Sequence, residues 1–113
     1  DVMTRGDKNH IARLEWERSQ ANRMILEDKI REEVITQYDH LQAALRLLVL
    51  EAQSLESQRL AFEVADTYFR AGTMKVEDYS SELLKKIGAE KSLEHSRIEA
   101  QKAYRMLREF VGI

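Results

Sequence analysis

The sequence contains no cysteine, no proline and only four glycines among its 113 residues. Without cysteine, the chain forms no disulfide and carries no thiol chemistry, although this absence alone assigns no cellular compartment. Proline and glycine make most tight turns, so their scarcity leaves few places where the backbone reverses. Leu, Ala, Glu, Lys, Arg and Gln are abundant and favour helix. The composition therefore predicts an all-α protein with long helices.

The chain also lacks an excess of one charge and a long apolar run. Its 18 Lys and Arg residues stand against 20 Asp and Glu residues, giving a formal net charge of −2. The two signs are interspersed, so no basic stripe is available to neutralise phosphates, and we expect no nucleic-acid partner. The longest apolar run is Leu47–Leu50, far short of the roughly 20 residues that cross a bilayer. We therefore expect no membrane-spanning segment.

Residues that would form a reaction centre are scattered along the chain. His10, His40 and His95 are the only histidines, and none belongs to a His-x-x-x-His or Glu-x-x-His pair. Acidic pairs such as Glu27-Asp28 suit solvated helix faces, and no serine lies in a nucleophile-elbow pattern. We expect a non-enzymatic protein with no catalytic, cofactor or metal site, and solvent-exposed histidines.

One glycine divides the sequence into two long stretches. No Gly or Pro occurs from Asp7 to Ala71, which predicts one helix over about 8–70, capped at its start by Asp7 or Thr4. Gly72 follows the basic residue Arg70 and is expected to stop this helix, since glycine commonly follows a helix C-terminus.

A second helix is predicted over about 76–111, after a tip at 71–75. Thr73 is expected to cap its start. Gly88 lies inside this helix and should weaken it by up to about 1 kcal/mol relative to Ala. Close packing against the facing helix, or a local bend, would account for a glycine there.

Apolar residues recur at alternating steps of four and three in both stretches, which predicts a coiled-coil hairpin. In the first helix this spacing selects Val34, Tyr38, Leu41, Leu45, Leu48, Ala52, Leu55, Arg59, Phe62, Asp66 and Phe69. In the second it selects Val76, Tyr79, Leu83, Lys86, Glu90, Leu93, Arg97, Ala100, Tyr104, Leu107 and Val111. If the turn centres on Thr73, facing residues have numbers that add up to about 146.

This register leaves residues 8–33 without an antiparallel partner. The unmatched arm carries the apolar residues Ile11, Leu14, Trp16, Ala21, Met24, Ile25, Leu26 and Ile30. Such a stripe marks a partner surface, unless a break near residue 30 folds the arm back. We favour self-association into a homo-oligomeric helical bundle, because no Gly or Pro marks a break. The residues expected to carry it are Ile11, Leu14, Trp16, Met24 and Ile25.

Several segments resemble the outer-membrane efflux protein family, the TolC-like channel components. The resemblance begins at Glu33–Ala44 (EVITQYDHLQAA) and is most specific at Phe69–Gly72 (FRAG) followed by Thr73–Tyr79 (TMKVEDY). The latter two are similar to the family's tip pattern, Y-x-x-G-x-x-x-x-x-D followed by an apolar residue. Ala103–Gly112 resembles the terminal Y-x-x-L-x-x-x-x-G, and Arg5–Lys8 the basic, glycine-containing segment that leads into this helix.

The resemblance implies a C-terminal periplasmic hairpin whose tip forms the aperture of a trimeric tunnel and faces a periplasmic adaptor protein. The residues that it places at the tip are Phe69, Gly72, Thr73, Met74, Lys75 and Asp78. Phe69 replaces the family's usual tyrosine, and Ser80 replaces a leucine two residues after the aspartate position. The family has two hairpins and a membrane barrel, so we expect this chain to be either a fragment or a small relative that has lost the barrel.

Two functions remain open from the sequence. The first is a periplasmic or outer-membrane-associated interaction module that self-associates and offers its tip to an adaptor-type partner in export. The second is a purely structural coiled coil whose tip binds nothing.

Overall fold

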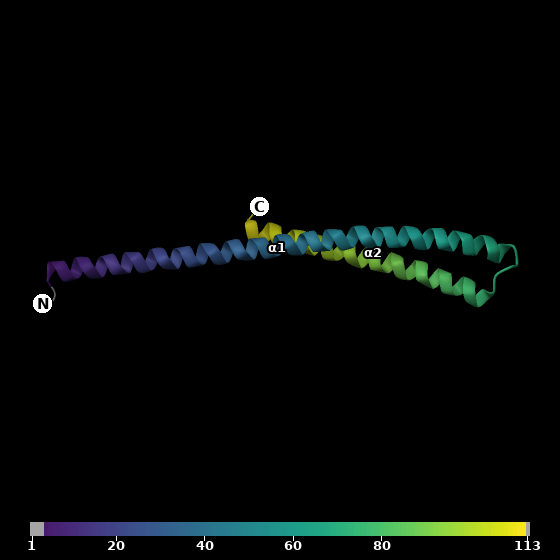
Figure 1. Cartoon of the computed structure of the whole chain (residues 1–113), viewed down its shortest axis with the longest axis horizontal. Coiled ribbons are helices and arrows are strands. Elements are labelled where there is room, and N and C mark those ends of the chain that lie inside the picture. The colour runs from purple at the N-terminus through teal and green to yellow at the C-terminus, as the bar shows by residue number, and fades with distance from the viewer. Residues whose placement is uncertain (1–3, 113) are drawn as a thin grey trace. The chain divides into compact units, whose positions relative to one another are not determined.

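The protein consists of two helices joined by a short connection. The computed structural model describes residues 4–112, and within them α1 spans Arg5–Arg70 and α2 spans Val76–Val111. Figure 1 shows α2 returning antiparallel beside the C-terminal part of α1. No strand occurs in residues 4–112. The predicted all-α hairpin is confirmed, and the observed helix ends lie close to the predicted ones except at the start of α1.

The start of α1 is fixed by a capping box. The Thr4 hydroxyl oxygen accepts a hydrogen bond from the Asp7 backbone N–H at 3.2 Å, and the Asp7 carboxylate accepts one from the Thr4 N–H at 3.2 Å. This reciprocal pair satisfies two backbone donors that a helix start otherwise leaves unbonded. The helix therefore begins at Arg5, three residues before the predicted boundary, with Thr4 as its cap.

Gly72 ends α1 in a Schellman motif. Its φ of 75° lies in the left-handed region. Its N–H donates to the Phe69 carbonyl at 3.0 Å, and the Thr73 N–H donates to the Tyr68 carbonyl at 2.9 Å, the two bonds that define this motif. The prediction that Gly72 stops the helix is thus confirmed.

Thr73 belongs to the end of α1 rather than to the start of α2. Its hydroxyl donates a second hydrogen bond to the Tyr68 carbonyl at 3.0 Å. The N-cap of α2 is Lys75, which makes no side-chain capping bond. The prediction that Thr73 caps α2 is wrong, because the Schellman turn directs its hydroxyl towards the preceding helix. Glu77 and Asp78 instead place negative charge in the first turn of α2, where the helix dipole favours it.

The chain divides into two compact units at Thr36. In the first unit, residues 5–36 form one stretch of α1, and among the described residues 4–36 only Gln20 and Val34 are half-buried. The apolar residues Ile11, Leu14, Trp16, Met24, Ile25, Leu26, Ile30 and Ile35 are all exposed in this stretch. The helix is unbroken through residue 30. We call residues 8–33 the arm.

In the second unit, residues 37–112, the core is a narrow strip along which α1 and α2 touch. Its buried residues are Leu41, Leu55 and Ala65 from α1 and Ser96, Ala100 and Ala103 from α2. The half-buried residues at the same spacing are Gln37, Ala44, Leu48, Glu51, Gln58, Phe62, Phe69, Tyr79, Glu82, Lys86, Ala89, Leu93 and Leu107. These positions recur at alternating steps of three and four on both helices, so the seven-residue period of a coiled coil is present.

Half of each predicted seam is displaced by one residue. The seven-spaced set containing Leu41, Leu48 and Leu55 lies in the seam, as predicted. The prediction for the seam positions between them is wrong: for example, Ala44 lies in the seam where Leu45 was expected. Those found exposed instead are Tyr38, Leu45, Ala52, Arg59, Val76, Glu90, Arg97, Tyr104 and Val111. At Ala44, Ala89 and Ala103 a small residue lies in the seam, and the larger side chain that follows it is exposed.

A buried glutamine oxygen weakens the seam. The Gln58 Oε1 atom is buried and has no hydrogen-bond partner among residues 4–112. A buried acceptor without a partner loses its hydration without compensation, at a cost of about 1–3 kcal/mol. The hairpin core is therefore thin and is destabilised by this buried polar atom.

Gly88 lies on an open face of α2. A Cβ atom built at this position meets nothing within 4 Å, so the suggestion of close packing against the facing helix is wrong. A Cβ atom built at Gly72 also meets nothing within 4 Å, but there the backbone is left-handed and a side chain would be strained.

These two glycines give opposite expectations for the same substitution. Gly88→Ala should raise the free energy of unfolding by up to about 1 kcal/mol, because it removes a helix-weakening glycine from open space. Gly72→Ala should lower it by about 1 kcal/mol, because alanine does not favour a positive φ. Urea unfolding followed by circular dichroism measures both. A loss of stability in Gly88→Ala would contradict the open face.

Candidate interaction surfaces

The tip of the hairpin rests on three aromatic rings. The Phe69 ring of α1 stacks on the Tyr79 ring of α2, with centroids 4.2 Å apart and planes 14° apart. Phe62 lies 5.4 Å from the same tyrosine at an angle of 37°. Aromatic pairs at such distances stabilise beyond the area that they bury. The three rings therefore hold the last turn of α1 against the first turn of α2.

A polar contact fixes the same tyrosine. The Tyr79 hydroxyl donates a hydrogen bond to Asp66 Oδ1 at 3.0 Å, and Asp66 Oδ2 lies 2.9 Å from Arg70 Nε. The hydrogen bond to Asp66 raises the pKa of Tyr79 above its ordinary value, because an ionised phenolate cannot donate it. Partial burial and the negative charge of Asp66 also raise this pKa, while Arg70 opposes the shift.

Lys86 closes the cluster on the side away from the tip. Its Nζ atom lies 4.8 Å from the centroid of the Phe62 ring and 4.0 Å from Glu90 Oε1. A lysine over an aromatic face gains a cation–π attraction while its aliphatic stem covers apolar surface. This contact explains how a charged residue occupies a seam position.

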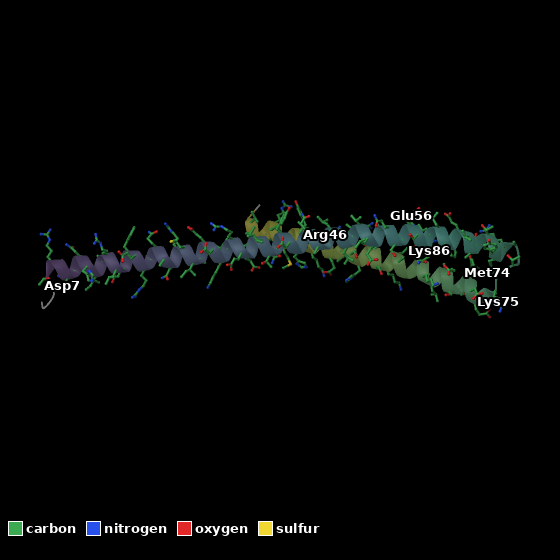
Figure 2. All side chains as sticks on the ribbon, viewed as in Figure 1. Asp7, Arg46, Glu56, Met74, Lys75 and Lys86 are labelled. Carbon is green, nitrogen blue, oxygen red and sulfur yellow. The ribbon has the colours of Figure 1, made fainter. Side chains whose placement is uncertain are left out.

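The six residues predicted at the tip lie in the connection and in the helical turns on either side of it. Figure 2 labels Met74 and Lys75 at this end of the hairpin. Lys75 and Asp78 are exposed, Met74 is half-buried, and Phe69 is half-buried in the aromatic stack. The Thr73 hydroxyl is held by the Tyr68 carbonyl. Of these six residues, Lys75 and Asp78 are thus the charged ones, and both are exposed.

Sequence reasoning missed the role of Asp66 and Tyr79 at the tip, because both were assigned to the apolar seam. Asp66 is half-buried beside the seam and accepts the hydrogen bond from Tyr79. The contact could have been predicted from two observations. Asp66 is a carboxylate in a mostly apolar repeat, and the predicted register places it opposite Tyr79.

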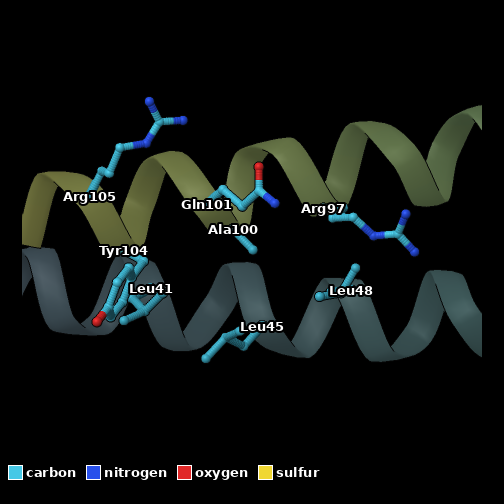
Figure 3. Close-up of a pocket in the computed structure, with 8 residues that line it drawn as sticks. All are labelled: Leu41, Leu45, Leu48, Arg97, Ala100, Gln101, Tyr104 and Arg105. Carbon is cyan, nitrogen blue, oxygen red and sulfur yellow. The ribbon is translucent and has the colours of Figure 1, made fainter.

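A groove of about 660 Å³ runs along the other end of the hairpin, within residues 37–112. Its lining comes from both helices and consists of Leu41, Leu45, Leu48, Arg97, Ala100, Gln101, Tyr104 and Arg105. Figure 3 shows these eight side chains along the facing stretches of the two helices, with Tyr104 against Leu41 and the Arg105 side chain directed away from α1. We call this feature the groove.

The groove also reports the register of the hairpin. Tyr104 stands opposite Leu41 and Ala100 opposite Leu45 in Figure 3. Both pairs have residue numbers that add up to 145, one less than the predicted sum of about 146. The hydrogen-bonded pair of Asp66 and Tyr79 has the same sum. The predicted register is therefore correct to one residue along this part of the hairpin.

The displaced seam creates the groove. Ala100 is small and buried, whereas Leu45 and Tyr104, which were expected inside the seam, are 40% and 55% exposed. The space above Ala100 is therefore bounded by apolar side chains that the hairpin does not cover. Leu45 is shared with a second apolar hollow on α1 lined by Gln42, Leu45, Arg46, Val49, Leu50 and Gln53.

The predicted self-association residues are spread along the arm, on the part of α1 within residues 4–36. Ile11, Leu14, Trp16, Met24 and Ile25 are each at least 40% exposed. Trp16, at 63%, exposes the largest ring in the chain. Their contact with another copy remains a prediction.

The histidines are exposed, and the described residues contain no group of His, Asp and Glu side chains arranged to hold a metal ion. None of the helices within residues 4–112 is apolar enough over a sufficient length to cross a membrane.

Comparison with known proteins adds no relative. No family model, no curated protein and no solved structure matches this chain.

The Tyr79 contact has a pH signature. The raised folded-state pKa means that its contribution to stability is present below the ordinary value of about 10 and is lost as pH rises through the folded value. Absorbance titration of the tyrosines should therefore show a late step that Tyr79→Phe removes. Thermal melts should show a stability gap between wild type and Tyr79→Phe that narrows above about pH 10.

Tyr68→Phe is the matched control, since Tyr68 is exposed on the last turns of α1. This variant should keep the late titration step. A late step that survives in Tyr79→Phe, or a stability gap that does not change with pH, would contradict the Tyr79–Asp66 hydrogen bond.

Proposed function

We propose that this chain is a non-catalytic, self-associating helical hairpin that acts in the periplasm and presents its tip to an adaptor-type protein in export, in the manner of TolC-like outer-membrane efflux proteins. The observation that carries the proposal is the large apolar surface that the chain leaves exposed. The tip contacts and the sequence resemblance give it its direction.

Each of the two units exposes large apolar side chains. In residues 4–36 these include Trp16 and Met24, and in residues 37–112 they include Leu50. Obligate subunit interfaces commonly bury 2,000–5,000 Å² in total, about half of it from each partner, and bury side chains of this kind. Self-association would thus cover apolar surface that neither unit covers by itself.

The tip supports the second half of the proposal. The Schellman turn at Gly72 and the Phe69–Tyr79 stack hold the connection in one conformation. A rigid loop loses little conformational entropy when a partner binds. Lys75 and Asp78 then present one positive and one negative group from fixed backbone positions.

The second candidate is a purely structural coiled coil, favoured by the same exposed apolar surface if the tip binds nothing. Both candidates require self-association, and only the first requires Lys75 and Asp78. The two properties are therefore tested separately.

Self-association should depend on the arm. In sedimentation equilibrium we expect wild type to form a discrete oligomer, and Trp16→Ala to weaken it by about tenfold or more, as truncation of a buried interface tryptophan does. Tyr68→Ala is the control, because it removes an exposed ring close to the tip. A wild-type chain that stays monomeric at high concentration would contradict the proposal.

Partner recognition should depend on the tip. In periplasmic cross-linking followed by mass spectrometry, the double variant Lys75→Ala, Asp78→Ala should capture several-fold less of the adaptor-type partner while its oligomer size stays constant. Glu56→Ala is the control, since Glu56 is an exposed charge on α1 away from the connection (Figure 2). Undiminished capture by the double variant would leave only the structural coiled coil.

A further inference from the structure

We infer that the groove of one chain receives the arm of a second copy, through the arm face formed by Glu17, Ala21, Met24, Ile25 and Asp28. This inference rests on the proposed self-association and assigns one of its contacts, on a face of the arm next to the one that carries Trp16. It treats the groove and the arm as separate features of two different molecules.

The groove has an apolar floor and a basic rim. Leu41, Leu45 and Leu48 form the floor on α1. On α2, Arg97 and Arg105 belong to the lining, eight residues apart and thus separated by about 12 Å along the helix. Arg97 also contacts Glu94 at 3.0 Å, in an exposed pair on the same helix. A matching ligand is therefore apolar in its middle and acidic towards its ends.

The arm carries a face of this composition. On a helix, positions 17, 21, 24, 25 and 28 fall within a stripe about 100° wide. Ala21, Met24 and Ile25 form its apolar centre, and Glu17 and Asp28 lie about 16 Å apart at its two ends. Asp28 contacts Arg31 of its own helix at 3.4 Å, in a pair exposed on both sides. Exposed pairs of this kind are weak, so the carboxylate remains available to a further arginine.

Charge decides between the arm and a second groove as the occupant. Two grooves placed face to face would bring Arg97 and Arg105 of one copy towards the same residues of the other. Like charges at an interface cost several kcal/mol. The arm face instead brings carboxylates to that rim and methyl groups to the leucine floor. Each copy has one arm and one groove, so a two-fold dimer would repeat the same contact twice.

The absence of cysteine makes the contact directly testable. A tagged Ile25→Cys chain is mixed with an untagged Leu45→Cys chain and oxidised mildly. A disulfide needs Cα atoms within about 7 Å, so a high yield of the mixed dimer reports the arm in the groove. Leu47→Cys is the matched control, since Leu47 is 46% exposed and, two residues further along, points to the opposite side of α1. We expect about tenfold less mixed dimer with it.

Three results would overturn the inference. Equal yields with Leu45→Cys and Leu47→Cys would place the arm elsewhere. A predominance of Leu45→Cys homodimers in an oligomeric sample would show groove against groove, and would leave the proposed self-association standing. A monomeric chain carrying both cysteines that closes an internal disulfide would show the arm of the same molecule in the groove.

Charge reversal provides an independent test of the same contact. Glu17→Arg with Asp28→Arg should weaken self-association by about tenfold or more in sedimentation equilibrium, and so should Arg97→Glu with Arg105→Glu. A chain carrying all four substitutions should recover to within about threefold of wild type. Failure of the four-fold variant to recover, while each pair alone weakens association, would overturn the pairing of these charges.

Discussion

The alternation of large apolar side chains with small or polar ones along the helix seam determines the rest of this structure. On α1, Leu41, Leu48 and Leu55 occupy every seventh position, and Ala44 and Glu51 lie between them. Small and polar residues bury little apolar area. The two helices of the hairpin therefore touch along a thin strip, and most of their large apolar side chains remain exposed. An outward-facing apolar surface follows from the way in which the inside is packed.

The tip compensates for this thin core at one end of the hairpin. Large rings lie in the seam there, from Phe62, Phe69 and Tyr79, and Asp66 accepts a hydrogen bond from the tyrosine hydroxyl. Towards the other end, Ala100 and Ala103 fill the corresponding positions of α2, and the groove opens over the leucines of α1. The same helix pair is thus closed at its tip and open where the groove lies. This asymmetry suits a fixed tip for a partner and an accessible flank for another helix.

The hairpin, its turn at Gly72 and its register to within one residue were predictable, because glycine placement and a seven-residue repeat specify them. The seam positions between every seventh residue were not predictable. Two seams that differ by one residue at these positions share every seventh residue, so the repeat alone does not distinguish them. Leu45 and Tyr104 are more apolar than Ala44 and Ala103, so a search for apolar residues selects the outer positions. The role of Thr73 depends on the turn geometry, which sequence spacing does not contain. The tip residues were suggested by a resemblance, and their binding role remains a prediction.

We propose that the hairpin is held by its own seam, whereas the arm needs another molecule to cover its apolar side chains. Amide hydrogen exchange measured over a range of about 1 to 300 µM protein distinguishes the two parts of α1. We expect protection of amides in residues 8–33 to rise with protein concentration, while amides near Leu55 and Ala65 keep the same protection throughout. Protection of the arm that does not change over this range would contradict it.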